Sequence, residues 1–424
     1  MKKIILILLI LTTNINASDI TKSLSNSPES LDLEVFKYIP NFEKAISYKT
    51  FNIPFEANPN LETLQYYFYR DLFRSPPTKN NRYFVKPSKN PYEFKFETIE
   101  NKFVKKQLKT KGILSYLYFE DGKIIIDEVS PKERLGKLFN DETKFRSNSM
   151  GKSLPSYILG HAICEGYIDS LNVRLNDWPL IKNTLYEDSM LHDLLNMKAG
   201  DQKWVGERRN VGSDNRIKGS KNENVNVIGL MKVMNEYLRG TEKSKLVYNY
   251  SALTTNVILN YVKYKTGDDW EKLLNKVYSE HVGVKNSVYL QRSKKYLKTD
   301  FISARYSFYA NRYDYLRIAK AMMDDWHNDT CAGKYLKTIY ESRVKKKDST
   351  KEADDVGLFT KAYGGQFHFD IYGIKKTRKI IGMSGFAGQQ ILIDLDNKRI
   401  IVVNSLYRNY NWKKIVHSVI KKDK

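Results

Sequence analysis

The stretch Phe145-Arg146-Ser147-Asn148-Ser149-Met150-Gly151-Lys152 is followed by a mostly apolar run, Leu154-Pro155-Ser156-Tyr157-Ile158-Leu159-Gly160. Ser149 and Lys152 are three residues apart, and on a helix such residues lie on one face about one turn from each other. A serine hydroxyl is a weak nucleophile without a base, and a lysine amine can serve as that base when burial favours its uncharged form. The apolar run predicts this burial. We therefore predict that Ser149 is a nucleophile and that Lys152 is its base.

The Ser-x-x-Lys spacing alone is weak evidence, because it also occurs at Ser342–Lys345 and Ser418–Lys421. Both of these copies lie in lysine-rich segments that we expect to be solvated. Only the Ser149 copy leads into an apolar helix, so it is the copy for which we predict chemistry.

Two hairpin patterns flank a helical middle. Residues 113–119 and 124–126 are apolar runs around an Asp-Gly turn, and residues 389–394 and 399–405 flank Asp396-Asn397. Helical periodicity is seen at 61–73, 94–111, 150–200, 226–240, 253–278, 311–326 and 412–422. Strands at both ends with helices between them predict an α+β fold, whose antiparallel sheet is closed by pairing the two ends.

The N-terminus has the features of a secretory signal. Lys2 and Lys3 precede the apolar run Ile4–Leu11, and a small residue, Ala17, follows a polar stretch. The run is far shorter than the about 20 residues of a membrane-spanning helix, which is the alternative. We predict a signal peptide over 1–17, an N-terminal extension of unassigned role over 18–94, a catalytic domain over 95–424, and a periplasmic or secreted protein.

The net charge of +23 could indicate nucleic acid, an anionic membrane face or an acidic cell-wall polymer as a partner. The basic residues are scattered, with short runs such as Lys345-Lys346-Lys347, and no nucleic-acid recognition module is visible. We expect a solvated surface with weak affinity for anionic cell-envelope polymers, no nucleic-acid partner and no stable membrane span. Cys164 and Cys331 could form a disulfide or be two buried thiols.

Several ordered blocks resemble one known family. These blocks are 145–166, Trp178-Pro179, 189–200, 248–253 and 382–389, and together they extend over about residues 95 to 420. They resemble the serine β-lactamase and penicillin-binding-protein family, in particular its class C-like branch with esterases and 6-aminohexanoate-dimer hydrolases. The resemblance implies a β-lactamase/transpeptidase-like fold, in which helices flank an antiparallel sheet and a mostly helical subdomain is inserted.

The resemblance also implies a catalytic tyrosine. Tyr248-Asn249-Tyr250-Ser251-Ala252 precedes a helical segment that ends at Thr266-Gly267. The spacing to Thr266-Gly267 matches Tyr250 to the family tyrosine, which shares the proton with Lys152 and passes it to the leaving group. Tyr248 is the alternative. Ala252 stands where class C enzymes carry an amide that contacts the substrate.

A third block, Gly382–Gln389, resembles the Lys/His-Thr/Ser-Gly strand that lines the pocket in this family. The resemblance implies that Ser384 and Gly385 line the pocket and that the backbone N–H groups of Ser149 and Phe386 form the oxyanion hole. Met383 replaces the usual basic residue, which helps to hold the carboxylate of a β-lactam. An ordinary glycine-containing hairpin is the alternative for this block.

Other catalytic patterns are absent from the sequence. It has no Gly-x-Ser-x-Gly motif, and its six histidines form no His-Glu-x-x-His pattern, so we predict neither an α/β-hydrolase nor a metal or cofactor. His161 is predicted to be a hydrogen-bonded helix residue. We expect an exported hydrolase of a small-molecule or peptide-like ester or amide. The alternatives are a β-lactamase or D,D-peptidase, and a catalytically silent relative that binds cell wall or another polyanion.

Overall fold

The computed structural model describes residues 58–73, 82–205, 217, 229–291, 308–346 and 360–422. The predicted signal peptide at 1–17 lies outside the described residues. The helix predicted at 61–73 is present as α5 (Leu61–Phe73).

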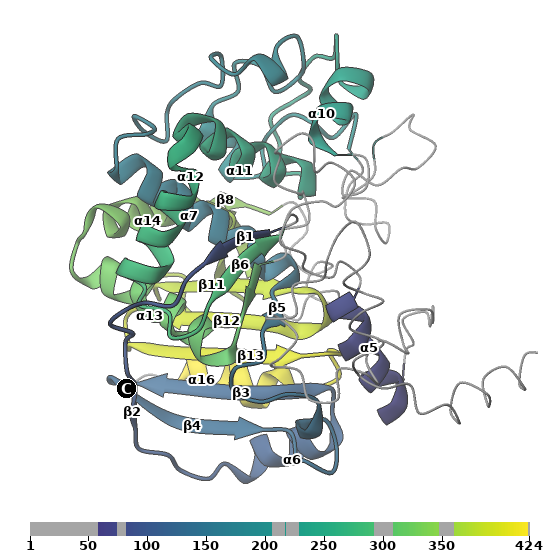
Figure 1. The fold of residues 1–424 in the computed structure, drawn as a ribbon, viewed down its shortest axis with the longest axis vertical. Coiled ribbons are helices and arrows are strands. Elements are labelled where there is room, and N and C mark those ends of the chain that lie inside the picture. Colours follow the sequence, from purple (N-terminus) through teal and green to yellow (C-terminus); the bar gives the residue numbers. More distant parts are fainter. Residues whose placement is uncertain are drawn as a thin grey trace, which may run out of the picture.

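A nine-stranded sheet forms the centre of the molecule (Figure 1). Among the described strands of this sheet every neighbouring pair is antiparallel, except that β2 runs parallel to β4. In spatial order the strands are β2 (Lys95–Phe96), β4 (Lys123–Val129), β3 (Ile113–Glu120), β13 (Arg399–Ser405), β12 (Gln389–Asp394), β11 (Ile380–Gly385), β10 (Phe367–Ile371), β9 (Thr360–Gly364) and β8 (Val344–Lys345).

The two predicted hairpins are confirmed. Asp121 and Gly122 join β3 to β4 with φ angles of 48° and 82°, the left-handed pair that a two-residue type I′ turn requires. Strand β13 then pairs with β3, so that Ile401 lies opposite Tyr118. The sheet is therefore closed by joining the two ends of the domain, as the α+β prediction expected.

Helices cover both faces of the sheet. Along β13, Ile400 and Val402 face one core, and Ile401 and Val403 face the other, because side chains alternate along a strand. The larger core is shared with α7 (Ser153–Cys164), α11 (Ala252–Thr266), α13 (Arg312–His327) and α14 (Cys331–Glu341), and α13 packs directly on β12 and β13. The smaller core lies under α6 (Lys102–Thr110), the π-helical turn η12 (Lys413–His417) and α16 (Ser418–Lys421).

A second sheet of four strands leads into the segment that contains Ser149. Its order is β1 (Arg82–Val85), β6 (Val288–Gln291), β7 (Phe308–Ala310) and β5 (Phe145–Arg146). Strand β5 is followed at once by the turn that carries Ser149. The chain before residue 95 thus contributes a strand to the sheet that positions this turn.

Short helices and helical turns connect the longer elements. Those around α11 lie at the β8 end of the large sheet (Figure 1). None of the described helices is long and apolar enough to cross a membrane. The shorter elements are η3 (Gly136–Leu138), η4 (Asn148–Lys152), η5 (Pro179–Ile181), α8 (Leu191–Leu195), α10 (Leu230–Lys232), η7 (Val233–Tyr237), η8 (Gly267–Asp269), α12 (Trp270–Leu274), η9 (Asn275–His281) and η11 (Phe386–Gly388).

The helix expected over 94–111 is wrong in its first half. Lys95 and Phe96 instead pair with β4, and the helix begins only after Asn101. The Asn101 side-chain oxygen accepts hydrogen bonds from the backbone N–H groups of Phe103 and Val104, at 3.1 and 3.0 Å. This N-cap pairs backbone N–H groups that the first turn of a helix leaves without a partner, so α6 begins directly after Asn101.

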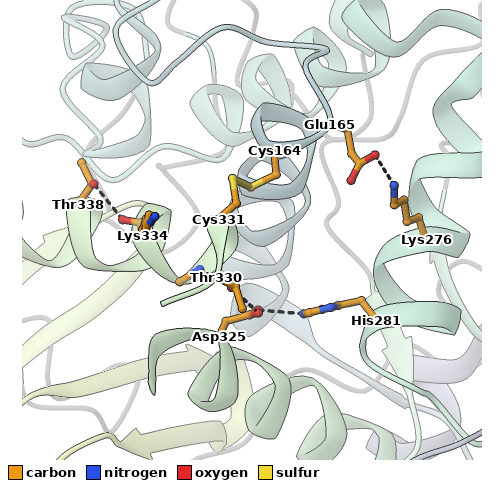
Figure 2. Close-up of a disulfide and its surroundings, with 10 residues drawn as sticks. Cys164, Glu165, Lys276, His281, Asp325, Thr330, Cys331, Lys334 and Thr338 are labelled. Atoms are coloured by element: carbon orange, nitrogen blue, oxygen red, sulfur yellow. Dashed lines mark hydrogen bonds and ion pairs between the residues drawn. A yellow bond between two sulfur atoms is a disulfide. The ribbon is translucent and has the colours of Figure 1, made fainter. Parts of the chain in front are cut away.

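The two cysteines form a disulfide, so the alternative of two buried thiols is excluded. Cys164 ends α7 and Cys331 begins α14, with their Cα atoms 5.8 Å apart (Figure 2). The bond closes a sequence separation of 167 residues and fastens α7 to α14.

Candidate active site

Ser149 and Lys152 meet in the structure. Both lie in the 3₁₀ turn η4, which connects β5 to α7. The Lys152 Nζ atom is 3.3 Å from the Ser149 Oγ atom. Lys152 is only 6 % exposed, whereas Ser149 is half-buried. A buried amine in contact with an accessible hydroxyl is the arrangement that a serine nucleophile with a lysine base requires.

The turn that carries Ser149 is held on both sides. Ser147 exchanges hydrogen bonds with Phe308 of β7: its N–H donates to the Phe308 carbonyl at 2.9 Å, and its Oγ accepts from the Phe308 N–H at 3.1 Å. Asn148 has a φ of 51°, a left-handed conformation that asparagine tolerates better than most residues. Its side-chain amide donates to the Phe386 carbonyl at 3.2 Å. These contacts tie the nucleophile turn to the end of β11.

Tyr250 lies beside the lysine. The Lys152 Nζ atom is 4.9 Å from the centroid of the Tyr250 ring. Tyr250 is buried, and its ring packs edge-on against Tyr363, with centroids 6.0 Å apart. Tyr248, the alternative in the sequence, packs against the same Tyr363 ring at 5.6 Å. The ring that lies over the lysine amine therefore belongs to Tyr250.

The end of β11 approaches the nucleophile turn closely. A Cβ atom on Gly385 would lie 2.5 Å from the Ser147 carbonyl oxygen, so only glycine fits there. The next residue, Phe386, is 45 % exposed. Ser384 is buried in β11. The end of β11 therefore lies directly against the turn that carries Ser149.

Two of the predicted substrate-contacting residues are buried. Met383 is fully buried in the larger core, together with Met150. Ala252 is 2 % exposed at the first position of α11, where Ser251 caps the helix by accepting a hydrogen bond from the Thr254 N–H at 3.2 Å. Neither residue offers a charged or amide group to a substrate.

A buried carboxylate that the sequence analysis missed organises the tyrosine segment. Asp201 is fully buried and accepts hydrogen bonds from the Asn249 amide at 2.7 Å, the Thr254 hydroxyl at 3.0 Å and the Tyr186 hydroxyl at 3.1 Å. Burial raises the pKa of the Asp201 carboxyl, and its hydrogen-bond donors oppose this rise. Asp201 thus connects residues on both sides of Tyr250, and no local motif marks it.

Gln366 is a second connecting residue that sequence reasoning missed. Its backbone carbonyl accepts a hydrogen bond from the Ser153 hydroxyl at 2.7 Å, and its side-chain oxygen accepts from the Thr255 hydroxyl at 2.5 Å. Its backbone N–H donates to the Leu195 carbonyl at 3.0 Å. One buried residue therefore links the starts of α7 and α11 to α8.

A buried basic pair lies behind the tyrosines. Lys346 was expected to be solvated with its neighbours, but it is 2 % exposed, and its side chain contacts residues of β9 and β10. Its Nζ atom is 3.1 Å from His368 Nδ1 and 2.8 Å from the Thr360 hydroxyl. The His368 ring packs edge-on against Tyr363, which in turn contacts Tyr250. These contacts correct the expectation of a solvated lysine run at this residue.

Comparisons with known proteins give structural relatives only. No protein-family model and no curated protein matches the sequence. Among solved structures, a protein assigned as a 6-aminohexanoate-dimer hydrolase from Bacillus anthracis superposes with a TM-score of 0.57 at 14% identity, covering 80% of this chain and 87% of that one. An octameric penicillin-binding protein homologue from Pyrococcus abyssi gives 0.51 at 16% identity, covering 72% of each chain. A class C β-lactamase from Rhodobacter sphaeroides gives 0.50 at 11% identity, covering 73% and 93%.

These superpositions establish the fold. Because the sequence identities are low, they do not establish the activity, which has to be argued from the chemistry of the site. The chain therefore has the fold of the serine β-lactamases and penicillin-binding proteins, as its sequence motifs predicted.

Proposed function

We propose that this protein is a serine hydrolase that cleaves an ester or amide through an acyl-enzyme on Ser149. The observation that carries the proposal is the 3.3 Å contact between Lys152 Nζ and Ser149 Oγ, made by a lysine that is 6 % exposed. A buried amine in contact with a serine hydroxyl has the geometry that proton transfer from that hydroxyl requires.

The reaction takes two steps. In the first, the Ser149 hydroxyl oxygen attacks the substrate carbonyl carbon while the Lys152 amine accepts the hydroxyl proton. The bond between that carbon and the leaving oxygen or nitrogen then breaks, and the proton reaches the leaving group through Lys152 and Tyr250. In the second step, water attacks the acyl carbon, the same groups accept its proton, and Ser149 recovers its hydroxyl.

The negative oxygen of each tetrahedral intermediate needs donors. The backbone N–H groups of Ser149 and Phe386 are the proposed pair, by resemblance to the family. Support comes from the contact of Asn148 with the Phe386 carbonyl at 3.2 Å and from the close packing of Gly385 on Ser147. These contacts fix the two donor-bearing segments to each other, and such preorganisation is what makes an oxyanion hole effective.

An uncharged ester or linear amide fits this site better than a β-lactam. Met383 is buried in the core and Ala252 has no polar group, so neither can hold a substrate carboxylate. Phe386 is 45 % exposed and offers an apolar wall.

We also propose that the protein is exported. The Cys164–Cys331 disulfide supports this, since disulfides persist mainly in oxidising compartments. The positive start and apolar run of residues 1–17 support it independently. Without Lys2 and Lys3 of the signal peptide the net charge of +23 becomes +21, which would favour weak association with anionic polymers in the cell envelope.

The test is mass spectrometry of the intact purified protein after exposure to p-nitrophenyl butyrate, penicillin G or a fluorophosphonate. We expect a fluorophosphonate adduct on Ser149, and turnover of p-nitrophenyl butyrate. Lys152→Met should slow both by about 10²–10⁴-fold, the usual contribution of a positioned proton acceptor.

Matched controls are available in the chain. Ser149→Ala must abolish the adduct, and Ser418→Ala, which alters another Ser-x-x-Lys copy, must leave it intact. Turnover of penicillin G in place of the ester would overturn the ester or amide assignment in favour of a β-lactamase. A Ser149 that reacts with none of the three compounds would indicate a silent, polyanion-binding relative.

A further inference from the structure

A histidine–histidine–aspartate cluster lies behind the nucleophile helix. His161 belongs to α7, His281 ends η9 and Asp325 belongs to α13. One potential metal-binding atom from each residue lies within 4.8 Å of those of the other two. The two imidazole rings are 4.8 Å apart between centroids, and His281 Nε2 is 3.0 Å from an Asp325 carboxylate oxygen (Figure 2).

The residues of α7 at this cluster share one face of the helix. Tyr157, His161 and Cys164 are four and three residues apart, the spacing that stacks side chains on a helix. Tyr157 donates its hydroxyl to Asp325 at 2.5 Å, and Cys164 is bonded to Cys331. A single helix face therefore presents a hydrogen-bond donor, an imidazole and a covalent link to the α13–α14 segment.

The Asp325 carboxylate is already oriented. One of its oxygens accepts from Tyr157 and His281, and the other accepts from the Thr330 hydroxyl at 2.7 Å. Asp325 is 1 % exposed. Hydrogen bonds to a liganding carboxylate from hydroxyl groups of this kind are typical of the shell around bound metals.

The second, independent observation concerns His161. The residue is 8 % exposed, and its Nε2 atom is buried with no hydrogen-bond partner among the described residues. Buried polar atoms are rarely left without a partner, so such an atom needs an explanation. This finding also corrects the expectation of a fully hydrogen-bonded helix histidine, and an imidazole nitrogen of this kind is a good ligand for a transition metal.

The geometry points to a binding site for a divalent transition metal of the zinc class, with His161, His281 and Asp325 as ligands. Two imidazoles and one carboxylate are a common ligand set for zinc, and they leave a fourth position for water. Ligands on bonds of about 2 Å lie roughly 3.4 Å apart around a tetrahedral ion, so the cluster must contract when the metal binds.

His281 is the residue that can make this adjustment. Its side chain is 36 % exposed, so it can rotate at the surface and also provides a path for the metal to enter. The nearby pair Glu165–Lys276 is mutually compensated, as the dashed contact in Figure 2 shows, so it places no unpaired positive charge beside the site. The metal would replace the hydrogen bond between His281 and Asp325.

The site would act on structure and not on the acyl transfer. His161 is eight residues into α7 from Ser153, which is about 12 Å along the helix axis. With the disulfide, the metal would hold α7 at two adjacent points against α13 and α14. The inference is independent of the proposed hydrolase activity.

The test is isothermal titration calorimetry with ZnCl₂ on the chelator-stripped protein. The protein is produced without a polyhistidine tag, and its disulfide is kept intact. We expect one zinc per chain and a zinc-dependent rise in Tm. Cobalt bound at the same site should give visible absorption bands, a readout of coordination that does not depend on activity.

The variants distinguish a site from surface binding. His281→Gln changes a partly exposed residue, so the protein should fold, and it should weaken zinc by at least about 100-fold, since loss of an outer partner alone costs 10–100-fold. His161→Gln should do the same. His327→Gln alters an exposed histidine two residues after Asp325 on α13 and should leave binding unchanged. An unmodified protein that binds no zinc below millimolar concentration would overturn the proposal, as would binding that survives both ligand variants.

Discussion

Gly385 packs so closely on Ser147 that a Cβ atom at residue 385 would lie 2.5 Å from the Ser147 carbonyl oxygen and 3.1 Å from the Met150 N–H nitrogen. Both neighbours are backbone atoms of the nucleophile turn, so they cannot move aside as a flexible side chain could. The position of Ser149 thus depends on the absence of a side chain in β11.

Gly385→Ala should therefore displace the nucleophile turn and lower kcat/KM. Misplacement of reacting groups by about 1 Å can cost about 10²-fold, and we expect a loss of this size in the rate of fluorophosphonate labelling. Gly166→Ala is the control, because nothing lies within 4 Å of its Cβ and any effect there reflects the backbone alone. Equal labelling rates for Gly385→Ala and the unmodified protein would contradict the prediction.

The two tyrosines that contact Tyr363 should differ sharply in their effect on activity. Tyr250 lies over the Lys152 amine and is the proposed proton carrier, so Tyr250→Phe should reduce kcat by about 10²–10⁴-fold. Tyr248→Phe removes a hydroxyl from the neighbouring ring and should change kcat little. Steady-state kinetics with p-nitrophenyl butyrate would check this, and the reverse pattern would reassign the role to Tyr248.

Asp201 should be a positioning residue for the tyrosine segment. Asp201→Ala removes the acceptor of three buried donors, each of which costs about 1–3 kcal/mol when left unsatisfied, so we expect a loss of about 3 kcal/mol or more in the free energy of unfolding. Asp201→Asn keeps the shape and should retain the fold but slow Ser149 labelling. Labelling at the unmodified rate in a folded Asp201→Asn protein would indicate a purely structural role.

Asp201 also predicts a pH dependence. Because burial raises its pKa, the carboxyl holds a proton more tightly in the folded chain than in the unfolded chain. As the pH rises through the pKa that the Asp201 carboxyl has in the unfolded chain, this carboxyl ionises in the unfolded chain before it ionises in the folded one. The contribution of Asp201 to the free energy of unfolding therefore falls. The unmodified protein should therefore lose stability relative to Asp201→Asn as the pH rises above the ordinary aspartate pKa of about 4. Urea unfolding of both proteins at matched pH would measure the difference.

Removal of the disulfide should destabilise the fold without touching the reacting groups. The bond closes a separation of 167 residues, and loss of such a link typically costs about 2–4 kcal/mol. Replacing both Cys164 and Cys331 by Ser should lower the urea midpoint accordingly. Dithiothreitol should not change the urea midpoint of the double variant. It should lower the urea midpoint of the unmodified protein to that of the double variant. Coincident unfolding curves with and without the disulfide would contradict the prediction.

Local signals made much of the fold predictable. Asp121-Gly122 identifies its hairpin because a two-residue turn needs left-handed residues, and the Ser149–Lys152 spacing brings two groups together within one helical turn. The start of α6 was missed because Lys95 and Phe96 pair with β4 through a parallel contact that no local pattern shows.

The remaining site residues could not be predicted because their partners are distant in sequence. Asp201 contacts Asn249 and Tyr186, and the histidine cluster draws on residues 161, 281 and 325. Metal motifs in sequences rely on short ligand spacings within one element, and this cluster has none. Lys346 was misjudged because a run of lysines normally indicates a solvent-exposed segment, whereas here the Lys346 amine is buried against Thr360 and His368.

The pairing of β13 with β3 has a consequence for how the chain is made. Arg399 lies opposite Glu120, so the middle of the large sheet cannot form until nearly the whole polypeptide has left the ribosome. Contacts between such distant residues slow folding, because a long loop must close before they form. During synthesis β3 must therefore keep an unpaired edge until β13 has been made, and in the export that we propose this delay would keep the chain unfolded for translocation.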